Sequence, residues 1–223
     1  MKRIIGKLAA LGALAAIVTG CATQPPQRKD YTAFRQADPR SVLVVPVVSR
    51  SVDVDAPDYF LSTISQPIAE RGYYVFPVNL IKRVMEDDGL GDANLVHASA
   101  TPKLAELFGA DAVLYVVIER WDSKYAVFST VTTVELSYSL KNGKSGNELW
   151  KHSEKMAYDP AAQQSQGGLA GLIAKAVVAA IEKAKPNYIP LARSVNGASV
   201  VRAGHGLPAG PYDPGYKADQ QQF

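Results

Sequence analysis

The first half of the chain alternates short apolar runs with apolar residues at helical spacing. Ser41 to Val48 is almost continuously apolar and β-branched, which predicts a strand buried on both faces. From Pro57 to Arg71 the apolar positions recur every three or four residues, which predicts a helix that Pro67 should kink or end early. Residues 73–77 predict a second strand, and residues 78–89 predict a second helix closed by an Asp-Asp-Gly turn. This order is typical of a right-handed βαβ unit.

The second half carries the strongest strand patterns of the chain, after an irregular stretch at residues 91–100 and a short helix at residues 101–108. Three strands are predicted, at residues 111–121, 124–140 and 148–158. Asn142 and Gly143 predict the hairpin turn before the last of them, and a final amphipathic helix is expected at residues 169–181. The sequence therefore predicts a single α/β domain. Its mixed sheet should have about five strands, a βαβ half followed by an antiparallel meander, with helices packed on it.

The first twenty residues follow a different pattern, that of an export signal. Lys2, Arg3 and Lys7 give a positive start, and residues 8–18 are almost entirely apolar. This apolar run is shorter than the ~20 residues that a transmembrane helix needs. We therefore expect residues 1–20 to be a signal peptide that is removed during export.

The residues that end this signal resemble the lipobox of bacterial lipoproteins. Val18, Thr19 and Gly20 stand directly before Cys21, although leucine is commoner than valine at the first of these positions. The resemblance implies cleavage before Cys21, a diacylglycerol on its sulfur and an acyl chain on its amine. Several acyl chains, at ~0.8 kcal/mol per buried methylene, make such an anchor lasting. Ala22 in place of aspartate implies transfer to the periplasmic face of the outer membrane.

The anchor is expected to lead into three further parts of the chain. Residues 21–39 are polar and rich in proline, which predicts a lipidated, flexible tether that reaches at most ~60 Å when extended. Residues 40–190 are expected to form the periplasmic domain. Glycine and proline dominate much of residues 191–223, so we expect this part to be a disordered tail.

The net charge and the motifs of the chain limit the classes of function that it can have. The formal net charge of +3 falls to about zero once residues 1–20 are removed, so electrostatics do not favour nucleic acid as a partner. Cys21 is the only cysteine, so no disulfide is available. His97, His152 and His205 fall in three different segments and predict no metal site. With no phosphate-binding loop, nucleophile elbow or zinc-binding helix motif, we expect no cofactor, no catalytic residues and no enzymatic activity.

Aromatic residues near the strands are better candidates for recognition than any residue is for catalysis. Trp121 and Tyr125 are expected at a hairpin connection, where exposed aromatic side chains often anchor interfaces. Tyr212 and Tyr216 in the tail are further candidates for binding a partner's groove, although a featureless tail is the simpler interpretation.

A hydrolase that acts on envelope polymers is an alternative from another class. Its carboxylates would be Glu119, Asp122 and Glu135. Glycoside hydrolysis needs two carboxyl groups roughly 5–9.5 Å apart across a cleft. Carboxylates dispersed over a flat sheet would therefore exclude this alternative.

Four segments of the chain resemble a family of outer-membrane lipoproteins of unassigned function. They are SVLVVPVV, RGYYVFPVNLI, FGADAVLYVVI and the NELW that ends the hairpin, at residues 41–48, 71–81, 108–118 and 147–150. Members are typically encoded beside a lipoprotein similar to the curli secretion pore CsgG, and their fold is similar to the amino-terminal domain of TolB and to LpoB. None of the four segments is a catalytic motif.

The resemblance implies a binding module. We expect an adaptor that helps an envelope transport or surface-structure complex to assemble, with a CsgG-like lipoprotein as its partner. The sequence does not decide whether the protein also forms a homo-oligomer. An LpoB-like activator of peptidoglycan synthesis is the alternative, and its enzyme would lie in the opposite membrane. The tether at residues 21–39 is short for that purpose, unless residues 191–223 do the reaching. A function inferred from fold is an analogy.

Overall fold

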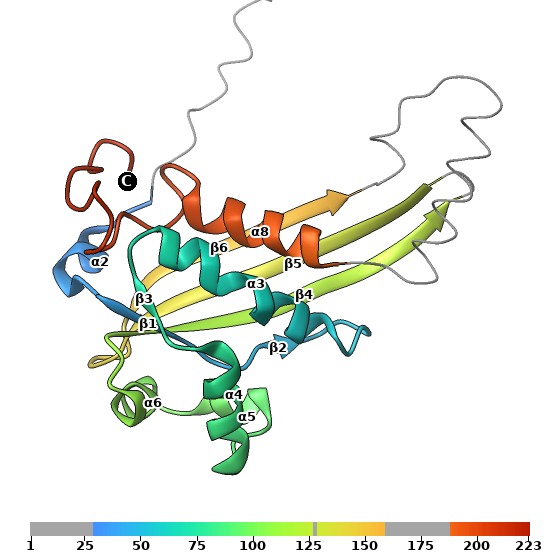
Figure 1. The fold of residues 1–223 in the computed structure, drawn as a ribbon, viewed down its shortest axis with the longest axis horizontal. Coiled ribbons are helices and arrows are strands. Elements are labelled where there is room, and N and C mark those ends of the chain that lie inside the picture. The colour runs from blue at the N-terminus through green and yellow to red at the C-terminus, as the bar shows by residue number, and fades with distance from the viewer. Residues whose placement is uncertain (1–28, 127–128, 159–187) are drawn as a thin grey trace, which may run out of the picture.

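The sheet in the computed structural model combines parallel and antiparallel pairing (Figure 1). The structure describes residues 29–126, 129–158 and 188–223. Five strands follow one another across the sheet, in the order β3 (Tyr74–Val75), β1 (Ser41–Val44), β4 (Ala112–Ala126), β5 (Ser129–Asn142) and β6 (Glu148–Tyr158). β1 pairs in parallel with β3 and β4, whereas β4, β5 and β6 form an antiparallel meander. The predicted α/β class and mixed sheet are confirmed.

A sixth strand arises because the apolar run at residues 41–48 is divided in two. β1 and the short β2 (Val48–Ser49) both pair in parallel with β4. Val44 pairs with Leu114 and Val48 with Val117, so the connecting segment has one residue more than the facing part of β4. Pro46 lies in that segment, where its missing N–H cannot join the ladder.

Two long helices cover one face of the sheet, α3 (Ala56–Glu70) and α8 (Ile189–Val201) (Figure 1). Phe60 of α3 and Val195 of α8 share one buried cluster with Leu136 and Tyr138 of β5. The alternation predicted for the strand at residues 124–140 places these two β5 side chains on the buried face. α3 continues past Pro67 to Glu70, so the expectation that this proline ends the helix early is wrong.

The opposite face is covered only in part, by α4 (Val78–Asp87), α5 (Ala93–Ala98) and α6 (Thr101–Phe108). Met85 and Val96 pack there with Leu43 of β1 and Val113 of β4. α5 replaces the irregular stretch expected at residues 91–100, because the Asp92 side chain accepts a hydrogen bond from the Asn94 N–H at 2.8 Å and caps the helix. On this face α6 contacts β5, and the described helices leave most of β5 and β6 open (Figure 1).

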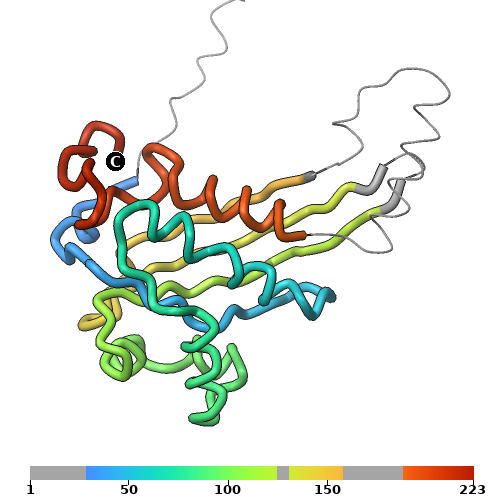
Figure 2. The backbone as a smooth tube through the Cα atoms, viewed as in Figure 1, coloured from blue at the N-terminus to red at the C-terminus, as the bar shows by residue number. Residues whose placement is uncertain are grey.

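At both ends of the described chain the structure differs from the predicted tether and the predicted disordered tail. Residues 32–37 form the helix α2 (Thr32–Ala37), and residues 202–223 pack beside it rather than forming a disordered tail (Figure 2). Phe34, Leu207 and Phe223 are buried, and the Tyr31 hydroxyl donates to the Gly206 carbonyl at 2.6 Å. The folded domain therefore includes segments on both sides of the expected boundaries at residues 40 and 190.

The anchor and the last predicted helix lie outside the described residues. These are Cys21 with the lipobox residues Val18, Thr19 and Gly20, and the helix expected at residues 169–181. Of the helices that the structure describes, none has the length and apolar character needed to cross a bilayer.

A candidate docking pocket beside the tether

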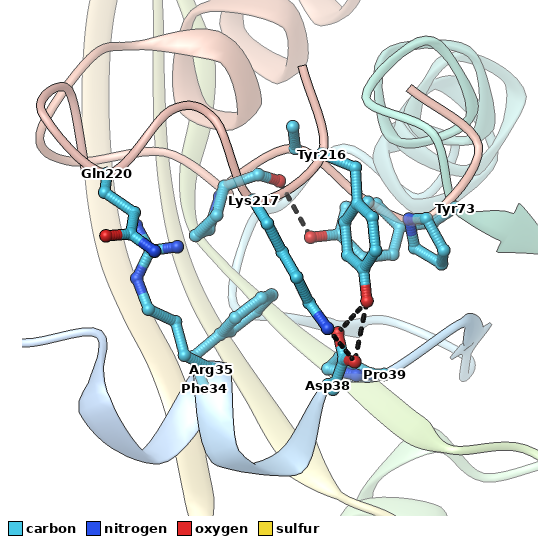
Figure 3. Close-up of a pocket in the computed structure, with 12 residues that line it drawn as sticks. Phe34, Arg35, Asp38, Pro39, Tyr73, Tyr216, Lys217 and Gln220 are labelled. Carbon is cyan, nitrogen blue, oxygen red and sulfur yellow. Dashed lines mark hydrogen bonds and ion pairs between the residues drawn. The ribbon is translucent and has the colours of Figure 1, made fainter. Parts of the chain in front are cut away.

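A pocket of about 110 Å³ lies between α2, the residue before β3 and the C-terminal segment (Figure 3). This "terminal pocket" has mainly apolar and aromatic walls and a polar rim. Its lining residues are Phe34, Arg35, Asp38, Pro39, Tyr73, Pro208, Ala209, Gly210, Pro211, Tyr216, Lys217 and Gln220. The pocket is thus built from segments that the sequence places at opposite ends of the chain.

Two glycines allow the C-terminal segment to lie against the end of α3. Gly72 follows that helix with φ +80°, a conformation that suits glycine at a helix end. A Cβ on Gly210 would lie 2.4 Å from the Gly72 carbonyl oxygen, which is too close for any side chain. The Gly210 N–H donates to the Arg71 carbonyl at 2.7 Å, and the Tyr212 N–H donates to the Gly72 carbonyl at 3.0 Å. This backbone pairing positions residues 208–211 as one wall of the terminal pocket.

Aromatic side chains form the floor of the terminal pocket. The rings of Phe34 and Tyr73 meet edge to face, with centroids 6.3 Å apart. The Tyr73 hydroxyl donates to the Pro208 carbonyl at 2.7 Å, and burial raises the pKa of this hydroxyl. Tyr73 therefore stays neutral and fixes the proline-rich wall to the floor.

The rim of the terminal pocket is held by Asp38, whose φ of +45° turns its side chain toward the C-terminal segment (Figure 3). Its carboxylate accepts hydrogen bonds from the Tyr216 hydroxyl at 2.7 and 2.6 Å and from Lys217 Nζ at 3.0 Å. Burial opposes the charge on Asp38, but these hydrogen bonds outweigh it and hold the pKa of the carboxyl below its ordinary value.

A second ion-pair network lies next to the rim. Arg71 donates to the Leu207 carbonyl at 3.0 Å and forms an ion pair with Asp219 at 3.2 Å. Arg35 donates to the main-chain oxygen of Phe223 at 2.9 Å. Because these contacts join α2 and α3 to the C-terminal segment, the walls of the terminal pocket are fixed from several sides.

The terminal pocket is suited to binding and not to covalent chemistry. Its residues offer aromatic surface, one ion-paired carboxylate and two basic side chains, without a nucleophile placed next to a general base. Within residues 29–126, 129–158 and 188–223, no cluster of histidine, cysteine and acidic residues could hold a metal ion.

Trp121 was expected to be exposed at a hairpin connection, and this is wrong. β4 continues to Ala126, and Trp121 is only 1% exposed. A bulge between Ile118 and Arg120 shifts the alternation of the strand, so Trp121 faces the same core as Ile118. Its ring stacks on Tyr59 at 6.2 Å. The side chain of Tyr125 lies outside the described residues.

The three carboxylates of the hydrolase alternative each have a cationic partner on the sheet. Their partners are Arg50 for Glu119 at 2.5 Å, Arg120 for Asp122 at 2.9 Å, and Lys155 for Glu135 at 3.3 Å. None of the three lines the terminal pocket. Surface ion pairs explain these carboxylates without any cleft between them.

The three histidines lie apart in different surroundings. His97 Nε2 lies 3.0 Å from the Pro46 carbonyl. His152 lies between two charged groups, with Nε2 3.1 Å from Glu154 and Nδ1 3.3 Å from Lys29 Nζ. Burial lowers the pKa of His97 and of His152, and burial lowers the pKa of Lys29 to about 8.

Unfolding is therefore expected to become easier in mild acid. A histidine whose pKa is lower in the folded than in the unfolded chain contributes stability above its unfolded pKa of ~6.5. That contribution is lost as the pH falls from ~6.5 toward the folded pKa. Urea unfolding at pH 7.5 to 5.5 should show a falling free energy of unfolding, with a shallower slope in His152→Gln and in His97→Gln. An unchanged slope in both variants would contradict this assignment. Lys29, whose pKa is lowered to about 8, adds a slope of the same sign near pH 7.5, so the histidine contribution is compared between pH 7 and 5.5.

The terminal pocket was missed because its residues lay in segments predicted to be a tether and a tail. The aromatic residues of these segments were an indication that the segments are ordered. They are Tyr31, Phe34, Tyr212, Tyr216 and Phe223. Disordered segments contain few aromatic residues. The spacing of these residues, however, follows neither a helical nor a strand period, so no packing partner could be predicted for them.

The mixed sheet with helices packed on both faces defines a single α/β domain. The chain belongs to the family whose model is described as "Putative lipoprotein GNA1162-like", which matches residues 29–211. A protein named "Putative lipoprotein NMB1124/NMB1162", from Neisseria meningitidis serogroup B (strain ATCC BAA-335 / MC58), is 36% identical over 178 residues, 80% of each chain. The lipoprotein family expected from the four sequence segments is confirmed.

One solved structure agrees with this membership. The crystal structure of lipoprotein GNA1162 from Neisseria meningitidis matches with a TM-score of 0.53 and 35% identity, over 64% of this chain and 98% of that one. The C-terminal domain of LpoB from Escherichia coli is a weaker match, with a TM-score of 0.37 and 17% identity over 54% of this chain and 85% of that one.

Proposed function

We propose that the protein is a lipid-anchored adaptor on the periplasmic face of the outer membrane, and that the terminal pocket is its docking site. Processing at the lipobox residues Val18, Thr19 and Gly20 would leave Cys21 as the acylated first residue. α2, which forms part of the terminal pocket, begins only eleven residues after Cys21. Those residues span at most ~36 Å when extended. This short chain distance between Cys21 and the terminal pocket is the observation that carries the proposal, because a lipid on Cys21 would hold the pocket near one membrane, where its partner must also be present.

The size and lining of the terminal pocket favour a protein side chain as its occupant. An apolar cavity of ~150 Å³ holds one benzene ring, so the smaller terminal pocket, of about 110 Å³, suits a single aliphatic side chain. An acyl chain of a lipid would be too long for it. The rim supplies Lys217, whose side chain is 62% exposed, to interact with polar groups around the inserted side chain. The partner is thus an envelope protein that presents one apolar side chain, and a CsgG-like lipoprotein is the first candidate.

Site-specific photo-crosslinking in intact cells tests this proposal. A benzoylphenylalanine at Lys217, on the rim, is expected to crosslink to an apolar residue of an envelope protein, identified by mass spectrometry. Adding Gln220→Trp, which fills the mouth of the terminal pocket from an exposed position, should reduce that crosslink at least ~10-fold, the equivalent of ~1.4 kcal/mol.

The matched control carries the crosslinker at Ser153, on the uncovered face of β6. Equal crosslinking to the same protein from Ser153, or a crosslink from Lys217 that Gln220→Trp leaves unchanged, would show that the terminal pocket is not the docking site.

The packing of the C-terminal segment does not favour the LpoB-like alternative. It depended on a C-terminal tail that could reach an enzyme in the opposite membrane. Leu207 and Phe223 are buried, and the Ala209 N–H donates to Asp219 at 2.6 Å, so residues 202–223 are held against the domain.

A further inference from the structure

The loop between β2 and α3 presents two aliphatic side chains to solvent. Val52 is 92% exposed and Val54 is 86% exposed, more than any other large apolar side chain among the described residues. They alternate with Asp53 and Asp55 in the sequence Ser-Val-Asp-Val-Asp at residues 51–55, the "valine loop". Apolar side chains that stay exposed together, framed by polar residues, favour a contact with another surface.

Hydrogen bonds hold the valine loop in its outward conformation. The Ser51 hydroxyl donates to the Trp121 carbonyl at 2.6 Å and accepts from the Asp53 N–H at 3.0 Å. The Asp55 N–H donates to the Asp53 side chain at 3.0 Å. The loop is thus fixed to β4 and leads directly into α3, so that little conformational entropy is lost when it binds a partner.

The valine loop cannot reach the terminal pocket of its own chain. In Figure 1 the loop after β2 and the helix α2, which lines the pocket, lie on opposite sides of the domain. Tyr73 of the pocket precedes β3, next to the strand starts at Ser41 and Ala112, whereas the valine loop is bonded to Trp121. The part of β4 from Ala112 to Trp121 spans ~30 Å, at ~3.3 Å per residue. A contact between this loop and a terminal pocket must therefore join two copies of the chain.

The terminal pocket matches a valine side chain in size and in polarity. Its volume of about 110 Å³ suits a single aliphatic side chain, and the rings of Phe34 and Tyr73 form its floor. A valine that enters it from the tip of a loop removes apolar surface from water on both partners and buries no polar side chain. Val52 is the more exposed valine and is the better placed to enter, with Val54 against the rim.

The valine loop carries negative charge. Neither Asp53 nor Asp55 takes part in an ion pair with another described residue. Arg50, at the base of the loop, is already paired with Glu119 at 2.5 Å. Two carboxylates thus flank the exposed valines without a neutralising partner, and they complement a surface that presents cations.

The rim of the terminal pocket presents its cations outward. Lys217 is paired with Asp38, and Arg35 is paired with Asp219 behind the rim. In both pairs the side chain of the cation is the more exposed one, so the carboxylate lies deeper. An approaching aspartate therefore meets the two cations before the two carboxylates, and this attraction orients the contact.

We propose that the valine loop of one copy inserts Val52 into the terminal pocket of a second copy. The inference rests on the docking role proposed for that pocket and names a second copy of the chain as an occupant. Because the contact joins two unlike surfaces, it builds a row or a ring of copies and not a symmetric pair. A row leaves the terminal pocket of its end copy free for a further envelope partner.

Photo-crosslinking of the full-length protein in intact cells tests the inference. A benzoylphenylalanine at Val54 leaves Val52 free to insert, and we expect a product of twice the mass of the chain, linked to a peptide that lines the terminal pocket. Adding Val52→Ser should reduce this product at least ~10-fold, because the inserted side chain loses its apolar surface. Leu80→Ser is the matched control, since it removes an exposed apolar side chain of α4 and should change the product less than ~2-fold.

The same cells distinguish this inference from the docking role itself. Gln220→Trp, which fills the mouth of the terminal pocket, should reduce the doubled product from Val54 as strongly as Val52→Ser does. A doubled product that withstands either change would overturn the inference, because the copies would then meet through other surfaces. A crosslink from Lys217 to another envelope protein, with no doubled product from Val54, would overturn self-association alone. The absence of crosslinks from both positions would overturn both proposals.

Discussion

A chain that ends after Val201 is expected to lose roughly 5 kcal/mol or more of its free energy of unfolding. Residues 202–223 bury Leu207 and Phe223, and each such side chain contributes about 1.5–3 kcal/mol when buried. The truncation also removes the carbonyl acceptors of Tyr31 and Tyr73, at a net cost of ~0.5–1.5 kcal/mol for each hydrogen bond that is exchanged for water. Domains of this size have ~5–15 kcal/mol in total, so the truncated chain should be at the edge of unfolding.

Urea unfolding followed by tryptophan fluorescence measures this loss. Leu207→Ala should account for ~2–5 kcal/mol of it, because the side chain is fully buried. Tyr212→Ala is the matched control, since that side chain is 69% exposed and its loss should change stability by less than ~0.5 kcal/mol. A truncated chain with an unchanged unfolding midpoint would show that the C-terminal segment is not part of the domain.

The sheet could be predicted because its strands have strong local periods. The alternation over residues 124–140 places Leu136 and Tyr138 on one face of the strand, and both side chains are buried in the structure. The position of Trp121 could not be predicted, since the bulge after Ile118 inserts one residue and reverses the faces beyond it. A local pattern cannot reveal such an insertion, because the bulge is defined only by the pairing with β5.

The terminal pocket could not be predicted because its contacts join residues that are far apart in the chain. Arg35 and Phe223 are separated by 188 positions, and Asp38 and Tyr216 by 178. Segments without a helical or strand period give no indication of such partners. The glycine and proline content of the C-terminal segment predicted disorder. In the structure, Gly210 of this segment lies against Gly72 at the end of α3, and the two backbones come close because neither residue has a side chain.

Replacing Cys21 by serine is expected to abolish acylation, so that the protein either moves to the soluble periplasmic fraction or keeps its uncleaved signal peptide. The sequence provides one thiol for lipid attachment, and no described helix is able to replace the anchor by crossing the bilayer. Each acyl chain contributes ~0.8 kcal/mol per buried methylene, so the loss of all chains removes far more free energy than any surface contact supplies. Without the anchor, the terminal pocket would no longer be held close to partners in the outer membrane.

Fractionation of cells that express the native chain or Cys21→Ser, combined with mass spectrometry of the amino-terminal fragment, tests the lipid anchor most directly. We expect the native fragment to begin at Cys21 and to carry the mass of its acyl groups, in the membrane fraction. The serine variant should lack that mass and be soluble or remain unprocessed. A serine variant that is trimmed at the same residue and is equally membrane-bound would contradict lipid anchoring.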